Sequence, residues 1–392
     1  MAEEKAKAVK KPNILVRALA AVVTLALVLG AVGLVVFRDS WNIDALKRRI
    51  TYRSIARSDS GQAASFLHEG TIRDVFAAPE RSLLVCSTAG VRLYSESGTC
   101  YVEKGVSFSE PTALAAGAWA VAYDLGGRDL CVFHGREEAY DLEIGGEDGI
   151  LSARINAAGQ LAVTARETGY KGTATVYDPT GARVLAVRLS SRFLMDAVVT
   201  GDGKTLAAAA VGQSGGSFDS SLLLYRLDGT GESAEPDASC SLGNDVVLDL
   251  AGSGSAVWAV GESGVYAVSA QGELLANYDY GSLYLKEYSL GGEDFAVVLT
   301  GKYRTGTSAS LTAVHTGETG SVTIPVREQV LSLSAAGRYV AVLTADRLDI
   351  YTSDLAPYAT LTGTGGARKV LMRGDGTALL LNGSTAQLYI PA

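Results

Sequence analysis

Two short motifs that recur along the chain restrict its possible folds more than any other feature. The first is an apolar pair followed four residues later by a turn glycine. Clear copies are Leu93-Tyr94 before Gly98, Val176-Tyr177 before Gly181, Leu224-Tyr225 before Gly229 and Ala267-Val268 before Gly272, and looser copies are Val132-Phe133, Ala313-Val314, Ile350-Tyr351 and Leu388-Tyr389. The copies lie roughly 37 to 48 residues apart, close to the repeat of about 40–45 residues of a four-stranded propeller blade.

The second motif is a tight turn that leads into a hydrophobic strand ahead of the apolar pair. It occurs at residues 158–163, 201–206, 336–341 and 374–379. Glycine and aspartate suit such turns because they tolerate positive φ. Two motifs in one phase predict an all-β fold, a closed β-propeller of eight blades, with seven blades as the alternative. The expected blades cover residues 72–105, 112–145, 150–190, 193–243, 245–279, 283–326, 329–363 and 367–392.

The last repeat ends after its third strand, at Pro391-Ala392. A candidate for the missing strand precedes the first blade, since residues 65–70 (SFLHEG) resemble residues 100–105 (CYVEKG), the expected last strand of blade 1. We therefore predict that residues 65–70 pair with the C-terminal blade and close the ring. Closure protects sheet edges that an open array would expose. The propeller domain is expected to cover residues 65–392.

An apolar segment lies ahead of the repeats. Residues 18–37 carry no charge, and about 20 helical residues span the ~30 Å hydrocarbon core of a bilayer. The run is long for a signal peptide and no small-residue cleavage site follows it. We expect a basic cytoplasmic tail at 1–13, an uncleaved transmembrane helix at 14–37, and a basic juxtamembrane stem and linker at 38–64.

Basic residues flank the apolar segment on both sides, so the positive-inside rule gives no clear orientation. The short basic tail is easier to retain in the cytoplasm, and long domains translocate largely regardless of charge. We therefore expect a single-pass membrane protein with its propeller outside the cytoplasm. Ile43, Leu46 and Ile50 are spaced for one face of a short helix in the stem. That helix either contacts lipid headgroups or serves as a spacer.

The repeats resemble the WD40-type and quinoprotein-type propellers in architecture, although they lack the Trp-Asp and Gly-His signatures. The order of basic tail, apolar segment, basic stem and degenerate propeller is similar to uncharacterised single-pass membrane proteins of Gram-positive, clostridial-type bacteria. That resemblance covers essentially the whole chain. It implies a fold and a location at the bacterial cell surface, and it implies no activity.

Composition excludes several functions. The formal net charge of −8 argues against a nucleic-acid partner, which requires a basic surface.

The four cysteines show no C-x-x-C spacing, and Cys86 and Cys100 fall on the second and fourth strands of one blade, too far apart for a disulfide. All four are expected to be buried apolar residues, and no metal site is predicted.

No catalytic constellation stands out. Residues 212–216 fit the G-x-S-x-G pattern of a hydrolase, but a strand follows where the nucleophile elbow needs a helix. His68, His134 and His315 fall in unrelated blades and are expected at the surface or at strand ends. We predict no catalytic residue and no cofactor.

Four acidic residues fall on expected first strands, which line the channel of a propeller. A ring of carboxylates could hold a cation, and the alternative is a solvated channel wall. These residues are Asp74, Asp196, Asp249 and Glu287.

Long connections gather on one expected face. The loops between second and third strands share a face with the connections between blades, and the longest such loops are 166–173, 212–221 and 301–310. Aromatic and charged side chains on these segments are typical of protein-binding surfaces. The candidates are Phe108, Tyr170, Lys171, Phe193, Phe218, Asp219, Tyr280, Tyr284, Lys302, Tyr303 and Arg304.

The sequence therefore favours a non-enzymatic binding or scaffold module for a protein or cell-envelope ligand. The alternative is a quinoprotein-like enzyme with a cofactor or metal in its channel. A third possibility is a structural subunit of an assembly.

Overall fold

The structure is a computed structural model that describes residues 22–25, 28, 43–71, 73–145, 149–228, 231–233, 235–317 and 320–391. The chain divides into two compact units, Met1–Ser54 and Ile55–Ala392.

In the first unit, α2 (Ile43–Thr51) confirms the short helix predicted from the spacing of Ile43, Leu46 and Ile50. Asp44 in its first turn and Arg48 and Arg49 in its last turn complement the helix macrodipole. Residues 22–25 and 28 are helical, and the rest of the predicted membrane helix at 14–37 lies outside the described residues. None of the helices described is both long and apolar enough to cross a membrane.

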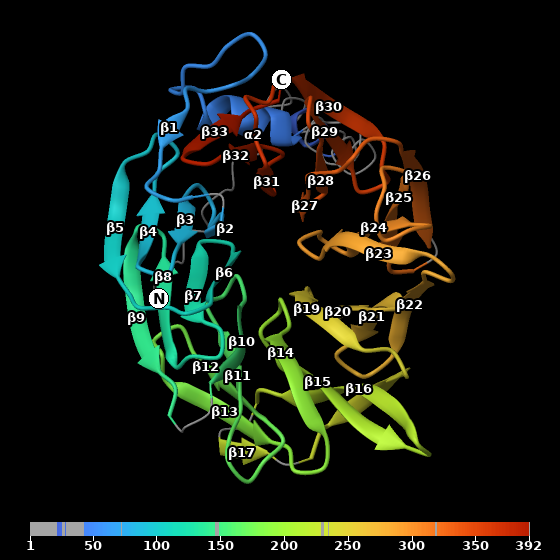
Figure 1. The fold of residues 1–392 in the computed structure, drawn as a ribbon. Helices are drawn as coiled ribbons and strands as arrows, with labels where there is room; N and C mark the ends of the chain where they lie inside the picture. Colours follow the sequence, from blue (N-terminus) through green and yellow to red (C-terminus); the bar gives the residue numbers. More distant parts are fainter. Residues whose placement is uncertain are drawn as a thin grey trace, which may run out of the picture. The chain divides into compact units, whose positions relative to one another are not determined.

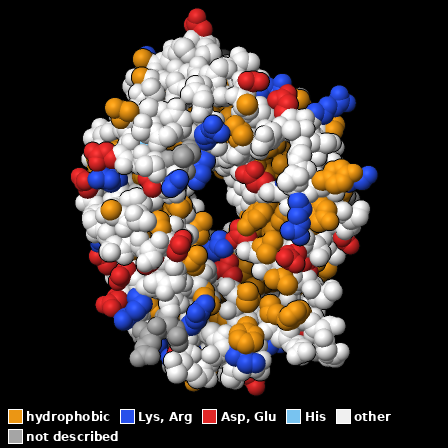
Figure 2. Space-filling view, viewed as in Figure 1, with side chains coloured by type: hydrophobic (Ala, Val, Ile, Leu, Met, Phe, Trp, Pro, Cys, Tyr) orange, Lys and Arg blue, Asp and Glu red, His pale blue; other side chains and the backbone are white. Residues whose placement is uncertain are grey.

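In the described residues, the second unit is a propeller of eight sheets, each built on four antiparallel strands, arranged around a central opening (Figures 1 and 2). The prediction of eight blades is confirmed, and the alternative of seven is excluded. The first four blades lie close to their expected bounds. Their strands are β2 (Val75–Ala77), β3 (Leu83–Cys86), β4 (Gly90–Tyr94) and β5 (Cys100–Gly105); β6 (Pro111–Ala116), β7 (Trp119–Asp124), β8 (Asp129–His134) and β9 (Glu137–Glu143); β10 (Ile150–Ile155), β11 (Leu161–Ala165), β12 (Thr173–Tyr177) and β13 (Arg183–Arg188); and β14 (Phe193–Val199), β15 (Thr205–Ser214), β16 (Ser217–Arg226) and β18 (Ala238–Gly243).

The last four blades follow the same order, with the first strand innermost (Figure 1). Their strands are β19 (Val247–Ser253), β20 (Ala256–Gly261), β21 (Gly264–Ser269) and β22 (Leu274–Asp279); β23 (Tyr284–Ser289), β24 (Phe295–Gly301), β25 (Ala309–His315) and β26 (Ser321–Val326); β27 (Ser332–Ala336), β28 (Tyr339–Leu343), β29 (Arg347–Thr352) and β30 (Pro357–Thr362); and β31 (Lys369–Met372), β32 (Ala378–Leu381) and β33 (Thr385–Tyr389) with β1 (Phe66–Leu67).

The hydrophobic core lies between neighbouring blades. Second strands such as β11 and β28 are buried along their whole length, because their side chains pack against a sheet on either side. The fourth strand β9 instead alternates between exposed and half-buried residues, since only one of its faces contacts another blade. The apolar pairs of the sequence fall on third strands, where residues such as Val176 and Leu224 are also fully buried.

The ring closes as predicted. β1 pairs antiparallel with β33, with Phe66 opposite Ala386 and Leu67 opposite Thr385. On either side of β1, the Ala63 amide donates to the Leu388 carbonyl and the His68 amide donates to the Ser384 carbonyl, both at 2.9 Å. A strand from the start of the domain therefore completes its last blade.

One strand was not expected from the repeats. β17 (Gly231–Ser233) lies in the connection between the third and fourth strands of blade 4. It pairs in parallel with β13 at the outer edge of blade 3, making that blade five-stranded. A strand that covers an edge in this way protects it from pairing with another chain.

The expectation for one cysteine was wrong. Cys86, Cys131 and Cys240 are buried as predicted, but Cys100 is exposed because it lies on an outer fourth strand. His68, expected at the surface or at a strand end, directly follows β1 and is buried next to the ring closure, where its Nδ1 accepts the Gly70 amide at 3.1 Å.

Candidate functional site

The first strands of blades 3 to 6 share an irregularity near the central opening. In each, the pairing with the second strand shifts by one residue, which leaves an extra residue as a β-bulge. The extra residues are Leu151, Met195, Leu248 and Lys286. The bulge leaves Met195 and Leu248 with 42% and 46% of their surface exposed.

The residue after each bulge is polar, and two of these side chains share one arginine. Arg154 of β10 lies 2.7 Å from Asp196 of β14 and 2.5 Å from Asp249 of β19. Ser152 donates a hydrogen bond to Asp196 at 2.5 Å. Burial raises the pKa of Asp249, and Asp196 adds to this effect while Arg154 opposes it. The guanidinium thus lies where a cation bound by both aspartates would have to lie.

The other two predicted channel carboxylates are held by backbone amides. Glu287 accepts the Leu333 amide at 2.9 Å, and burial raises its pKa. Asp74 precedes β2 and accepts the Thr71 amide at 2.6 Å. The four carboxylates therefore connect neighbouring blades and fix turns. This geometry favours a channel wall held together by these contacts over a ring of carboxylates that binds a cation.

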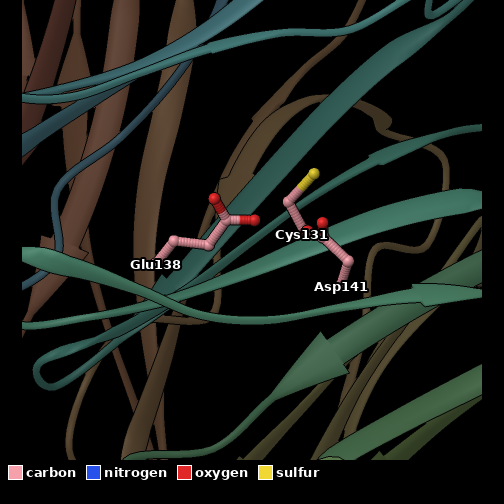
Figure 3. A group of neighbouring side chains, drawn as sticks. All are labelled: Cys131, Glu138 and Asp141. Atoms are coloured by element: carbon pink, nitrogen blue, oxygen red, sulfur yellow. The ribbon is translucent and has the colours of Figure 1, made fainter.

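A different group of possible metal ligands lies on blade 2. The ligand atoms of Cys131, Glu138 and Asp141 all lie within 4.8 Å of one another (Figure 3). The ammonium of Lys104, on the outer strand of blade 1, already contacts both carboxylates. Burial raises the pKa of Cys131 to about 12, so its sulfur is a thiol rather than the thiolate that metals bind. The cluster is thus an ion-paired contact between blades 1 and 2.

The exposed aromatic side chains lie on one face of the propeller. We call it the aromatic face: it is formed by the connections between second and third strands and by those between blades. Among the described residues, every Phe or Tyr with a largely exposed side chain belongs to it. They are Tyr170 (45% exposed), Phe193 (58%), Phe218 (67%), Tyr284 (45%) and Tyr303 (65%).

Two of the predicted binding residues are not available for contact. Phe108 and Tyr280 are buried, with 4% and 3% of their surface exposed. Each lies where the chain crosses from one blade to the next, and its ring enters the hydrophobic core there, between blades 1 and 2 for Phe108 and between blades 5 and 6 for Tyr280. Sequence position alone did not distinguish an aromatic ring that is buried between two blades from one that faces solvent.

Basic side chains lie against the exposed rings. Lys171 Nζ is 4.9 Å from the centre of the Phe193 ring, and the Arg304 guanidinium is 5.3 Å from that of Tyr284. Lys302 Nζ is 5.7 Å from the Tyr303 ring. Such cation–π contacts hold long side chains in place at the surface. Aromatic and basic side chains of this face therefore lie side by side in the structure.

Phe218 is carried by a β-hairpin rather than by the predicted loop at 212–221. β15 and β16 continue to a two-residue turn at Gly215 and Gly216, whose φ angles of 59° and 86° suit a type I′ turn. Phe218 lies opposite Gln213 near the tip. Asp219, the next residue, forms an ion pair with Arg192 at 2.6 Å. The small residues in this segment concealed its strand character.

An open groove of about 800 Å³ crosses the aromatic face from blade 5 to blade 7. In Figure 2, hydrophobic side chains gather beside the central opening over β14, β19 and β23, with basic side chains among them. The groove lining combines apolar, basic and acidic residues. It includes Leu248, Leu283, Tyr284, Leu285, Lys286, Leu299, Arg304, Glu262, Glu328 and Val330.

Met195, Leu248 and Lys286 were missed as surface residues. A signal existed in the sequence, because each bulged residue is followed by an acidic one, in Met195-Asp196, Leu248-Asp249 and Lys286-Glu287. In a strand without a bulge, strict alternation of side chains would place Met195 and Leu248 among the residues that form the channel wall. The bulge changes which way they face.

Comparison with known proteins supports the fold. The model of a family of unknown function, DUF5711, matches residues 70–303, and no curated protein matches the sequence. The WD40 domain of SCAP from fission yeast is similar over 83% of this chain and 96% of its own, with 10% identity and a TM-score of 0.51. A quinohemoprotein alcohol dehydrogenase from Pseudomonas putida HK5 is similar over 84% and 75%, with 10% identity and a TM-score of 0.49. At such identity, the likeness to the WD40 domain shows a propeller fold alone.

Proposed function

The chain belongs to DUF5711, a family of unknown function, and we propose that it is a non-enzymatic binding module that holds a protein or cell-envelope ligand on its aromatic face. The observation that carries the proposal is the confinement of the exposed Phe and Tyr side chains of the described residues to that face. Aromatic residues are enriched where proteins bind one another and dominate the binding energy there.

The exposed rings are well prepared for binding. Phe193 and Tyr284 are the first residues of inner strands, and Phe218 is held by a paired hairpin. Four of the five rings contact a lysine or arginine. Because these contacts restrict the side chains, a ligand that binds them loses less conformational entropy than it would on unrestrained side chains.

A membrane anchor is part of the proposal. The uncharged run at 18–37 supports a single span within 14–37, and the size of the domain supports an extracytoplasmic propeller at a bacterial cell surface. Alkaline extraction tests the anchor, and protease treatment of intact cells tests the orientation. A chain released by alkali, or a propeller cleaved only after lysis, contradicts this part of the proposal.

Among the residues that the structure describes, no observation supports the enzyme alternative. Trp119, whose flat ring would suit a quinone, stacks on His134 at 4.2 Å, and Trp258 is fully buried in blade 5. On the channel wall, Arg154 pairs with Asp196 and Asp249. We therefore develop the binding function.

The direct test is capture of the ligand by the full-length chain in detergent. The variant Tyr170→Ala, Phe218→Ala, Tyr303→Ala removes three exposed rings from blades 3, 4 and 6. We expect it to lose crosslinked capture from cell-envelope extracts while its thermal unfolding stays close to that of the parent. A matched control is Leu274→Ala with Leu275→Ala, which removes exposed apolar side chains from the outer strand of blade 5. Retained capture by the triple variant, or equal loss in the control, refutes the proposal.

A further inference from the structure

The strand that closes the ring is short for the fourth strand of a blade. β1 has two residues, whereas the fourth strands β5 and β30 have six each. Leu67, one of the two, leaves 74% of its surface exposed, so it adds little buried apolar area. A segment held by so few contacts can open locally while the rest of its domain stays folded.

His68 takes part in this closure with both its backbone and its side chain. Its amide donates to the Ser384 carbonyl at 2.9 Å, directly beyond the paired residues of β1 and β33. Its imidazole keeps only 2% of its surface exposed. The ring meets the Phe76 ring of β2 edge to face, with 5.3 Å between the two centres. The imidazole is thus buried where the closing strand of blade 8 meets the first strand of blade 1.

One hydrogen bond fixes the protonation state of this imidazole. The Gly70 amide donates to His68 Nδ1 at 3.1 Å. Because a backbone amide can only donate, Nδ1 is unprotonated in the closed ring, and the neutral imidazole carries its proton on Nε2. A proton on Nδ1 would set two donors against each other and place a charge on a buried ring.

The surroundings of His68 also favour its neutral form. Burial lowers the pKa of His68, and the Thr385 and Asn382 carbonyls and the Asp74 carboxylate offset part of this effect. An exposed histidine has a pKa of about 6.5, so the opened segment binds the proton more readily than the closed one. The stability that the neutral imidazole gives to the closure is therefore complete above that pH and is lost as pH falls through the folded pKa.

One other group near this junction can gain charge in the same pH range. Lys369 Nζ of β31 lies 5.3 Å from the centre of the Phe76 ring and 3.5 Å from the Asp74 carbonyl oxygen, and burial lowers the pKa of Lys369. A test has to separate its protonation from that of His68. Further charged or titratable groups on the surrounding segments include Glu69, Asp74, Cys86, Arg92 and Tyr94.

We propose that closure of the propeller is a proton-sensitive switch, in which protonation of His68 Nδ1 releases β1 from β33 while the other blades stay folded. Release leaves one edge of β33 without a backbone partner, and such an edge can pair with a strand of another chain. The switch lies at the ring closure and does not depend on the ligand of the aromatic face.

Hydrogen exchange of the full-length chain in detergent tests the switch directly. Mass spectrometry measures the exchange of residues 63–68 at pH 7.5 and pH 5.5, and protection factors remove the chemical effect of pH on the exchange rate. We expect protection of this segment to fall by up to about tenfold, which is the ratio of protonated to neutral histidine at pH 5.5 for a pKa of about 6.5. Strands β11 and β28 should keep their protection. Unchanged protection of residues 63–68, or an equal fall in all three segments, overturns the inference.

Matched variants identify the group that titrates. In His68→Asn, the side-chain oxygen can accept the Gly70 amide as Nδ1 does, but it takes up no proton, so the loss of protection at pH 5.5 should disappear. His134→Asn changes an exposed histidine at the end of β8, and Lys369→Met removes the other candidate. Both should lose protection as the parent does. Loss that persists in His68→Asn, or that disappears in Lys369→Met, overturns the inference.

Nitrogen NMR of the parent gives a readout that needs no substitution at position 68. The chain has three histidines, so His134→Asn and His315→Asn assign the remaining signal to His68 in ¹⁵N-histidine-labelled protein. We expect an unprotonated Nδ1 at pH 7.5 and its protonation over the pH range in which residues 63–68 lose protection. A proton on Nδ1 at pH 7.5, or a protonated His68 in a chain whose β1 stays protected, overturns the inference even if His68→Asn fails to fold.

Discussion

Arg154 of blade 3 reaches past blade 4 to Asp249 of blade 5, with 2.5 Å between the guanidinium and the carboxylate. The same guanidinium contacts Asp196 of blade 4 at 2.7 Å. One side chain thus connects three consecutive first strands at the wall of the central opening. Since these side chains keep only about a fifth or less of their surface exposed, their charges are stabilised by one another rather than by hydration.

Replacing Arg154 is therefore expected to destabilise the propeller. Arg154→Met leaves Asp196 and Asp249 close together without a cation, and breaking a buried ion pair typically costs about 3–5 kcal/mol. We expect a loss of about 2–4 kcal/mol in the free energy of unfolding, measured by denaturant titration. Adding Asp196→Asn and Asp249→Asn should recover part of it. The exposed pair of Arg226 and Asp237 gives the control, because Arg226→Met should cost about 1 kcal/mol or less.

The ring closure predicts a stabilising disulfide. Leu67 and Thr385 are directly opposite in an antiparallel pair, where Cα atoms lie about 4.5–5.5 Å apart, within the range that a disulfide spans. In a Cys100→Ser background, oxidised Leu67→Cys with Thr385→Cys should be about 2–4 kcal/mol more stable than its reduced form. Non-reducing electrophoresis and thermal unfolding measure bond formation and stability. If the bond forms quantitatively and the melting temperature does not rise, closure contributes little to stability.

Glu287 predicts a pH-dependent change in stability. Burial raises its pKa, so the folded protein binds this proton more readily than the unfolded chain does. The resulting stability is complete below the unfolded pKa of about 4.3 and is lost as pH rises through the folded pKa. Glu287→Gln keeps an oxygen for the Leu333 amide and removes the buried charge. We expect the variant to melt above the parent at pH 7.5, with a smaller difference at pH 4.

The exposed residue Glu273 provides the comparison for Glu287. Glu273→Gln should leave the melting temperature unchanged at both pH values. A Glu287→Gln variant that shifts the melting temperature equally at pH 7.5 and pH 4 would show that the effect comes from packing rather than from the charge.

The four cysteines are expected to differ in reactivity. Burial raises the pKa of the Cys86 and Cys131 thiols to about 12, and Cys240 is also buried, whereas Cys100 is exposed. At pH 8 the native protein should react rapidly with a thiol reagent at one site, and the denatured protein at four. Cys100→Ser should abolish the rapid phase. A rapid phase that persists in this variant would mean that a buried strand opens.

The blades could be predicted from the sequence because each is a local unit. The apolar pairs end third strands that pack on both faces, and the turns before them need positive φ, as at Gly159 and Gly203. Both signals depend on a few neighbouring residues. The closing strand was also predictable, since Phe66-Leu67 copies the pattern of an existing fourth strand.

The candidate site was predictable only in part, because its details depend on contacts between blades. Arg154 meets Asp249 through two inter-blade interfaces, which no local pattern reveals. Phe108 and Phe193 both lie near blade connections, yet one ring is buried and the other exposed. The bulges at Met195 and Leu248 depend on pairing with the second strand. For Arg154 and Phe108 the deciding neighbours lie on another blade, and for the bulges they lie on the next strand of the same blade.

The closure between β1 and β33 also sets an order for folding during protein synthesis. Leu67 and Thr385 are more than 300 residues apart in the chain, so β1 leaves the ribosome long before its partner exists. Blades 1 to 7 have their four main strands close together in sequence and can form as they emerge. Blade 8 cannot form until β33 has been synthesised, and β1 stays unpaired until then. Until the C-terminal strands have been synthesised, the N-terminal end of the nascent propeller is therefore the part most exposed to mispairing or to chaperone binding.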